Sequence, residues 1–332
     1  MRSNRSRCLS SWRIAALDQK SLYSFGIHLI LWSGLQRLCV YNHPAHLTQQ
    51  PKDWHGDCQV SSMNQAWIAG LLLSALNAVP QPSTAEIIRR SVANTRADWN
   101  MAPDYNFTER DVVTGNAQSS TKTYLVMMID GSPYDKLIAA NGRQLAPALA
   151  AEEERKLQEE IAQRAHETRS EKRKRIAEYI RGRRQDDDLL QEMIKAIDFQ
   201  LTGEDTVDGR RCFVLEGSPK PGYRPKTRDT KVLKGMRGEM WIDEQQYQWV
   251  KVQAKVFRPV AFGLFIAHVE PGTEFTLEQQ PVQGTLWLPS HFSMHVKARV
   301  LRFWSHNSND DETYWDYSRT SQGAMAATTA GR

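Results

Sequence analysis

The sequence predicts an α+β fold in which one strongly curved antiparallel sheet, an unclosed half-barrel, has its apolar concave face covered by helices. Two observations lead to this prediction. Helical patterns open the body of the chain and return in its middle, and from about residue 199 onward apolar and polar residues alternate. Alternation with a period of two is typical of antiparallel strands that bury one face, and it does not fit a doubly wound parallel sheet.

The stretch MNQAWIAGLLLSALNAVPQPSTAE, residues 63–86, has the form of an export signal inside the chain. Its uncharged run at 66–76 is about as long as a signal-peptide core and is short for a bilayer span. We therefore expect translation to start at Met63, a signal peptide over 63–78, and residues 1–62 to be a non-native or disordered upstream leader. A membrane-proximal leader that uses residues 25–41 is the alternative.

The remaining residues, 79–332, are expected to form a single domain in the periplasm. A bacterial lipoprotein signal needs a cysteine at its cleavage site, and no cysteine occurs between residues 59 and 211. The mature protein is therefore expected to be exported and soluble, with no lipid anchor and no stable membrane span after signal cleavage.

The charge of this body does not favour a nucleic-acid partner. The whole chain has 43 Lys and Arg against 38 Asp and Glu, but seven of the bases and three of the acids lie in residues 1–62. Residues 63–82 have no charge, which leaves 36 bases and 35 acids for the rest. Nucleic-acid binding requires a basic field that such a body lacks.

Helices are predicted in two places. Ser83 and Glu86 have the spacing of a capping box, and apolar residues follow at helical spacing, so we expect a helix over about 84–96. Residues 151–188 are a charged helical insert with eleven acids and eleven bases, which is typical of helices that lie on a surface. An amphipathic helix over 186–199 then presents a wide apolar face: Leu189, Leu190, Met193, Ile194 and Ile197.

Strands are predicted at 104–113 and 122–131, and in greater number after residue 199. The segment 247–257 places Val250, Val252, Ala254 and Val256 on one face and Trp249 on the other. The segments 273–279 and 291–300 alternate in the same way, and Gly-containing turns separate the strands. We expect about eight to eleven strands in all.

The chain has no recognisable catalytic motif, and we predict no catalytic residue, no cofactor and no metal site. His291 and His295 share a strand face at about 13 Å, which is too far apart for one ion. His306, Asp310, Asp311 and Glu312 would be the ligands of a loop metal site, but solvated loop charges are the preferred interpretation. Cys212 lies in the apolar run RCFVLEG and is expected to be a buried structural thiol.

The hairpin GEMWIDEQQYQWVKVQAKV at 238–256, with VLEGSPKPGY before it and GTLWLPSHFSMHVKARV after it, resembles the outer-membrane lipoprotein-sorting proteins of the LolA/LolB-like superfamily. The likeness covers about residues 84–318 and extends to uncharacterised exported proteins of soil bacteria. The resemblance implies a half-barrel with a hydrophobic cavity that shelters the acyl chains of a lipoprotein crossing the periplasm.

The function implied by this resemblance is a non-enzymatic carrier whose partner is acylated cargo, a lipoprotein or a lipid. Met127, Met128, Met193, Met240 and Met294 would give the cavity an adaptable surface. A cell-envelope scaffold with a filled core that binds an envelope protein is the alternative, and an unrecognised hydrolase is a third hypothesis. The residues expected to line the cavity are Met127, Met193, Val250, Val252, Ala254, Val256, Phe275, Leu277, Phe292, Met294 and Val296.

Overall fold

The computed structural model describes residues 81–115, 119–227, 229–262, 267–300 and 304–320. The predicted leader at 1–62 and the predicted signal peptide at 63–78 lie outside the described residues. Every element described below belongs to one unit that contains Ser83–Arg332.

The body begins with helix α2, Thr84–Met101, where the sequence predicts a helix. The Ser83 hydroxyl accepts a hydrogen bond from the Glu86 backbone N–H at 3.2 Å, which satisfies one of the free donors of the first turn. The helix continues five residues beyond the predicted end at 96, because Thr95 and Asp98 are buried against the sheet and extend the contact face.

Thirteen strands form one antiparallel sheet within the described residues. Eleven of them follow the order β4-β3-β2-β1-β13-β12-β11-β8-β7-β6-β5, and β10 pairs with β12 and with β9. The strands are β1 Tyr105–Gly115, β2 Ser119–Ile129, β3 Ser132–Ala140, β4 Arg143–Gln144, β5 Ile197–Val207, β6 Arg210–Pro219, β7 Met236–Asp243, β8 Trp249–Val256, β9 Val260–Phe262, β10 Ala267–Val269, β11 Glu274–Gln283, β12 Leu286–Val300 and β13 Trp304–Arg319.

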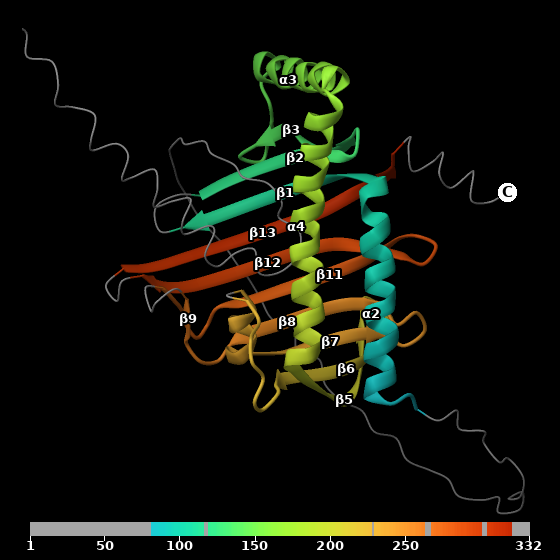
Figure 1. Cartoon of the computed structure of the whole chain (residues 1–332), viewed down its shortest axis with the longest axis vertical. Helices are drawn as coiled ribbons and strands as arrows, with labels where there is room; N and C mark the ends of the chain where they lie inside the picture. Colours follow the sequence, from blue (N-terminus) through green and yellow to red (C-terminus); the bar gives the residue numbers. More distant parts are fainter. Residues whose placement is uncertain (1–80, 116–118, 228, 263–266, 301–303, 321–332) are drawn as a thin grey trace, which may run out of the picture. The chain divides into compact units, whose positions relative to one another are not determined.

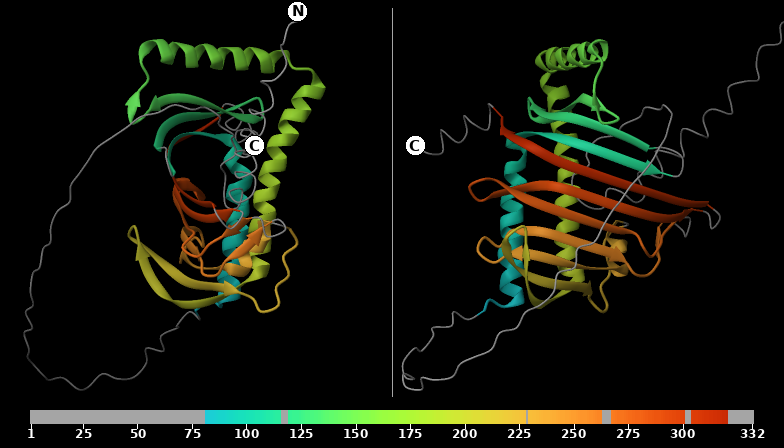
Figure 2. Two further views of the ribbon diagram at one scale, coloured as in Figure 1. Left: turned by 90° about the vertical axis from the view of Figure 1, so that its left-hand side faces the viewer. Right: turned by 180° about the vertical axis from the view of Figure 1, so that it is seen from behind.

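The predicted fold class is confirmed, because the sheet is antiparallel and unclosed, with β4 and β5 at its two edges. Figure 1 shows helices α2 and α4, Arg169–Ala196, crossing the strands of the sheet. Both helices lie on the same side of the curved sheet (Figure 2). The strand number exceeds the expected eight to eleven because β4, β9 and β10 have only two or three residues each, too few for alternation to show in the sequence.

The core lies between this face of the sheet and the two helices. Buried apolar side chains come from every layer, with Ile87 on α2, Leu189 on α4 and alternate residues of the strands. Phe275 and Leu277 on β11 are buried, whereas their neighbours Glu274, Thr276 and Glu278 are on the opposite face. The alternation predicted from the sequence therefore corresponds to a dry face and a wet face of one sheet.

The charged insert forms two helices, α3 at Pro147–His166 and α4. Thr168 separates them and begins α4 with a capping box to Glu171. The predicted charged helix and the predicted amphipathic helix are parts of one continuous helix of 28 residues, because Gly182 does not interrupt it. Ile197, expected on the helix face, is instead the first residue of β5.

Two arginines attach the corner between α3 and α4 to the turn between β2 and β3. The buried guanidinium of Arg164 donates to the carbonyl oxygens of Ile129 at 2.6 Å and Ser132 at 2.8 Å. Arg175 donates to the Ser132 hydroxyl at 2.7 Å and pairs with Glu167 at 2.6 Å. A turn of two strands thus becomes the anchor that fixes where α4 starts its path across the sheet.

His306, Asp310, Asp311 and Glu312 lie on strand β13, so their interpretation as solvated loop charges is wrong. Glu312 is 7% exposed and faces the helices, since its partner on β12 is the buried Phe292. Asp311 is on the opposite face, where it accepts a hydrogen bond from His291.

Within the described part of the chain, none of the helices combines the length and apolarity needed to cross a bilayer.

Candidate functional site

An apolar pocket opens between the second half of α4, the 3₁₀-helix η2 (Asp229–Gly235) and the sheet. Its space free of atoms is about 780 Å³ when the solvent-open part is included. The lining residues are Leu189, Leu190, Met193, Ile197, Phe199, Gly217, Leu233, Met236, Arg237, Gly238, Glu239, Met240, Trp249, Val252, Gln253, Ala254, Phe275 and Leu277.

The sheet is hollowed here because a row of small residues crosses it. Gly217 on β6 pairs with Gly238 on β7, which pairs with Ala254 on β8. These positions face the helices, since the next residue in the row is the buried Phe275. A Cβ atom built on Gly238 would lie 2.2 Å from the Gln253 carbonyl oxygen, so only glycine permits this approach of β7 and β8.

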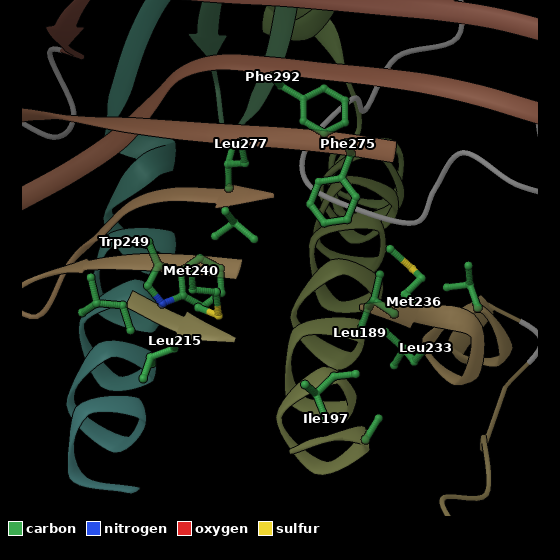
Figure 3. Packing of buried hydrophobic residues seen from close by; sticks show 14 of the residues in the cluster. Leu189, Ile197, Leu215, Leu233, Met236, Met240, Trp249, Phe275, Leu277 and Phe292 are labelled. Carbon is green, nitrogen blue, oxygen red and sulfur yellow. The ribbon is translucent and has the colours of Figure 1, made fainter. Parts of the chain in front are cut away.

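Helix α4 forms the opposite wall. Leu189, Leu190 and Met193 project toward the strands from two successive turns. In Figure 3, Leu189 extends from α4 while Met240, Trp249 and Leu277 extend from the sheet. Long, unbranched Met side chains on such a wall adapt their shape more readily than branched ones.

A buried glutamate holds the loop before η2 against α4. Glu192 accepts hydrogen bonds from Lys226 at 2.8 Å and Lys195 at 3.0 Å, and Tyr223 donates to it at 3.3 Å. The hydrogen bonds from Lys226 and Lys195 hold the pKa of Glu192 below its usual range. This contact closes one side of the pocket, because the loop leads directly into the wall residue Leu233.

Helix α2 fixes the tryptophan of the pocket wall. The Trp249 indole N–H donates to the buried hydroxyl of Ser91. About two turns further along the helix, burial raises the pKa of Asp98 to about 7, although the Trp287 backbone N–H and the Gln248 side chain both donate to it. Polar contacts therefore pack α2 on the sheet and hold the Trp249 ring in place.

Five of the eleven predicted lining residues are at this pocket: Met193, Val252, Ala254, Phe275 and Leu277. Val256, Phe292 and Val296 are buried in packed parts of the interior instead. Met294 is half-buried against the main core, beyond the end of the pocket. The alternation in the sequence places these side chains on the helix-covered face of the sheet. It does not show which parts of that face are filled by packed side chains.

Val250 and Met127 are on the face opposite to the one we predicted. The β7–β8 register skips one residue between the pairs Trp241–Lys251 and Ile242–Trp249, so Val250 is the extra residue of a β-bulge. The bulge turns Trp249 toward the core and Val250 toward a separate small cluster with Cys212. Met127 directly follows the buried Val126 on β2 and therefore faces away from it.

Several wall residues were not expected from the sequence, above all Gly217, Gly238, Leu233 and Met236. The two glycines carried a usable signal, because a glycine inside an alternating strand often marks a close backbone approach. Leu233 and Met236 carried none, since Leu233 lies on the short η2 and Met236 is the first residue of β7.

The acidic groups with altered protonation are not lining residues of this pocket. Burial raises the pKa of Glu312 to about 7 and that of Asp310 to about 6, and the Asp111 charge adds to both effects. Burial also raises the pKa of the Cys212 thiol to about 11, which fits the predicted structural role. The described residues contain no group of metal-ligating side chains. Most of the pocket lining is apolar.

The opposite face of the sheet carries a wider and polar groove. Its floor is a register row across six strands: Glu216, Glu239, Gln253, Thr276, Ser293 and Asp311. The two faces thus differ sharply in polarity, and only the helix-covered face is suited to an apolar ligand.

No protein-family model matches the chain, and a comparison with curated proteins finds no match either. The chain is similar in fold to solved structures at low identity. A domain described as an outer membrane lipoprotein-sorting protein, from Vibrio parahaemolyticus, is 10% identical with a TM-score of 0.29, over 70% of this chain and 93% of that one. A LolA superfamily protein from Nitrosomonas europaea is 8% identical with a TM-score of 0.27, over 68% of this chain and 93% of that one.

A DUF1329 family protein from Desulfovibrio piger is 12% identical with a TM-score of 0.26, over 68% of this chain and 93% of that one. At these TM-scores the likeness is distant, so the function has to be inferred from the geometry of the pocket.

Proposed function

We propose that the protein is a periplasmic, non-enzymatic binding or carrier protein that shelters an acyl chain of a lipoprotein or a lipid. The supporting observation is the pocket between α4, η2 and the sheet, whose walls are Leu, Ile, Met, Phe, Val and Trp side chains. Apolar pockets with few polar groups are the usual sites for such ligands. The carboxyl groups with raised pKa values, Asp98, Asp310 and Glu312, are not among its lining residues.

The size of the pocket suits a segment of an alkyl chain. The pocket is partly open to solvent, so it encloses only part of such a chain. Each methylene group that it removes from water contributes about 0.8 kcal/mol. A longer chain continues into the solvent-open part of the pocket, where it is held less tightly. Partial enclosure favours a carrier, because cargo that is gripped along only part of its length can be released.

Displacement of a fluorescent fatty acid from the purified full chain tests this proposal. Affinity is expected to rise with chain length in a series of saturated fatty acids and to level off once the chain fills the enclosed part of the pocket. Ala254→Leu places a bulky side chain in the row of small residues and should weaken binding at least about ten-fold, which corresponds to ~1.4 kcal/mol. The matched control is Ala162→Leu on the exposed face of α3, which should bind like the unchanged protein.

A cell-envelope scaffold that binds a protein partner is the second candidate. The observation in its favour is the dense packing of Val256 and Phe292, 2% and 4% exposed, on the face predicted to be hollow. A protein that is lipid-free after solvent extraction and ignores every fatty acid of the series would support the scaffold. A hydrolase would be indicated only by ester or peptide cleavage that persists through stringent purification.

A further inference from the structure

Four basic side chains gather beside the η2 wall of the pocket and form what we name the basic patch: Lys234, Arg237, Lys255 and Arg258. Arg237 on β7 and Lys255 on β8 are register partners. The Arg258 guanidinium donates to the Lys234 carbonyl oxygen at 2.8 Å, which brings the end of β8 onto η2. All four side chains are exposed.

The charges of the basic patch are not used inside the described part of the molecule. The nearest ion pairs involve other bases, Lys226 with Glu192 and Lys251 with Glu278. Two carboxylates adjoin the patch in the sheet register, Glu274 beside Lys255 and Glu239 two pairs further along β7. Arg237 and Lys255 also line the polar groove with Glu216, Asp310 and Asp311. No ion pair joins the patch to these carboxylates among the described residues.

An exposed aromatic ring lies within the patch. Phe257 is 41% exposed, although a side chain of this size is usually buried. The Arg237 and Arg258 guanidinium groups lie over its ring at 5.7 Å and 5.3 Å from the centroid. Aromatic rings flanked by basic side chains are typical of surfaces that bind at the boundary between lipid headgroups and acyl chains.

The basic patch also stands directly next to the pocket. Arg237 itself is a lining residue, and Lys234 follows the lining residue Leu233 on η2. Arg237 and Lys255 also line the polar groove on the other face of the sheet, so the basic patch reaches from that groove to the rim of the apolar pocket. Phospholipids combine these two chemistries in one molecule, with the phosphate at the surface and the chains below it.

We propose that the basic patch and Phe257 dock the protein on a bilayer that is rich in anionic phospholipid. Guanidinium groups pair with phosphate oxygens in two parallel hydrogen bonds, and the ammonium groups add unspecific attraction. The Phe257 ring enters the headgroup layer, and the η2 wall of the pocket then faces the lipid. Docking rests on the patch alone, whereas the passage of an acyl chain into the pocket rests on the proposed function.

Flotation of the full chain with vesicles tests the docking. Vesicles of equal parts phosphatidylglycerol and phosphatidylcholine should carry the protein, and pure phosphatidylcholine vesicles should not. Lys234→Gln with Lys255→Gln, which leaves the lining residue Arg237 unchanged, should weaken partitioning about twenty-five-fold, at about five-fold for each charge near an anionic surface. Phe257→Ser should weaken it about ten-fold through the lost burial of part of the ring.

The matched control is Arg169→Gln with Lys174→Gln, two exposed bases in the first turns of α4, far along the helix from the pocket. It removes the same charge and should change partitioning less than about three-fold, a minor part of the effect expected for two patch charges. Thermal unfolding of each variant checks that it is folded. Added salt should release the protein, because exposed charges are screened.

Three results would overturn the docking proposal. The first is equal loss of binding in the control and the patch variants, which would indicate attraction to the net charge of the protein. The second is unchanged binding by the patch variants. The third is release by inorganic phosphate at constant ionic strength, which would assign the patch to a soluble anion. Uptake of the fluorescent fatty acid should be unaffected in the patch variants, so failure of docking and failure of the pocket are separate outcomes.

Discussion

The carboxyl group of Glu312 provides a quantitative test of how the sheet is built. Glu312 lies on β13 between Asp111 on β1 and Phe292 on β12, and its side chain is 7% exposed. Burial raises its pKa to about 7 from an ordinary value of 4.5. The Tyr314 hydroxyl donates a hydrogen bond to this carboxyl group and lowers its pKa. The charges of Asp111 and Asp310 raise the pKa further.

This rise in pKa makes folding stability depend on pH. A carboxyl group with a raised pKa in the folded state contributes stability that is fully present below its unfolded pKa and is lost as the pH rises through its folded pKa. For Glu312 the loss begins near pH 4.5 and is complete slightly above pH 7. The difference of about 2.5 pKa units corresponds to about 3 kcal/mol at 1.36 kcal/mol per unit.

Glu312→Gln removes this loss because the amide keeps the shape and a hydrogen-bond acceptor without ionising. The variant should be more stable than the unchanged protein by about 3 kcal/mol at about pH 8, and similar to it within about 1 kcal/mol near pH 5. Urea unfolding followed by tryptophan fluorescence across this range measures both. Glu216→Gln on the exposed face of β6 is the control and should leave the pH dependence as it is. If Glu312→Gln shows the same slope of stability against pH as the unchanged protein, the group is not buried as described.

Three further mutations and one processing test follow from the same structure. Leu215→Ala removes a side chain that is 0% exposed and should cost about 2–5 kcal/mol in urea unfolding. Arg164→Ala leaves carbonyl oxygens of the β2–β3 turn without a donor, so it should cost about 3 kcal/mol and speed amide exchange in that turn. Trp249→Phe should lower the free energy of unfolding by about 1–3 kcal/mol, because it leaves the Ser91 hydroxyl unpaired. Adding Ser91→Ala to Trp249→Phe should change stability little, and a double-mutant cycle measures this. N-terminal sequencing of the protein from an envelope fraction should find a mature end near Val79, and an intact Met1 would contradict the predicted export.

The fold class was predictable because two local signals agree with the tertiary structure. The Ser83–Glu86 pair marks the start of α2 with a hydrogen bond that needs no partner elsewhere in the chain. Phe275 and Leu277 alternate with polar residues because one face of β11 is buried and the other meets solvent. Such signals follow from the chemistry of a few neighbouring residues, so one sequence is enough to detect them.

The features that were not predictable depend on pairing between distant segments. The bulge at Val250 exists only in relation to β7, since the strand itself alternates without a break. Gly182 weakens a helix by only about 1 kcal/mol, and packing outweighs this loss. The continuity of α4 therefore depends on packing, which the sequence does not show. Glu312 was assigned to solvent because a run of three acids gives no sign that one of them faces the core.

The pocket could be predicted only in part, because a hollow is made by what is missing on several strands at once. Gly217 and Gly238 each indicate a close backbone approach within their own strands, but they come into one row with Ala254 only through the register of β6, β7 and β8. Five predicted lining residues surround that row because they share the apolar face. The sequence therefore predicted the lining chemistry of the site better than its position.

A hollow made by small residues and lined mostly by apolar side chains selects a ligand by thickness and apolarity, and such a lining does not distinguish one alkyl chain from another. Recognition of the cargo must then come from groups outside the pocket, and the basic patch is the nearest candidate, with Arg237 belonging to both. Ala254→Leu should therefore weaken uptake of fatty acid without affecting vesicle binding, whereas Lys234→Gln with Lys255→Gln should do the reverse. If either variant impairs both activities to the same extent, pocket and patch act as a single site and the division between containment and docking is wrong.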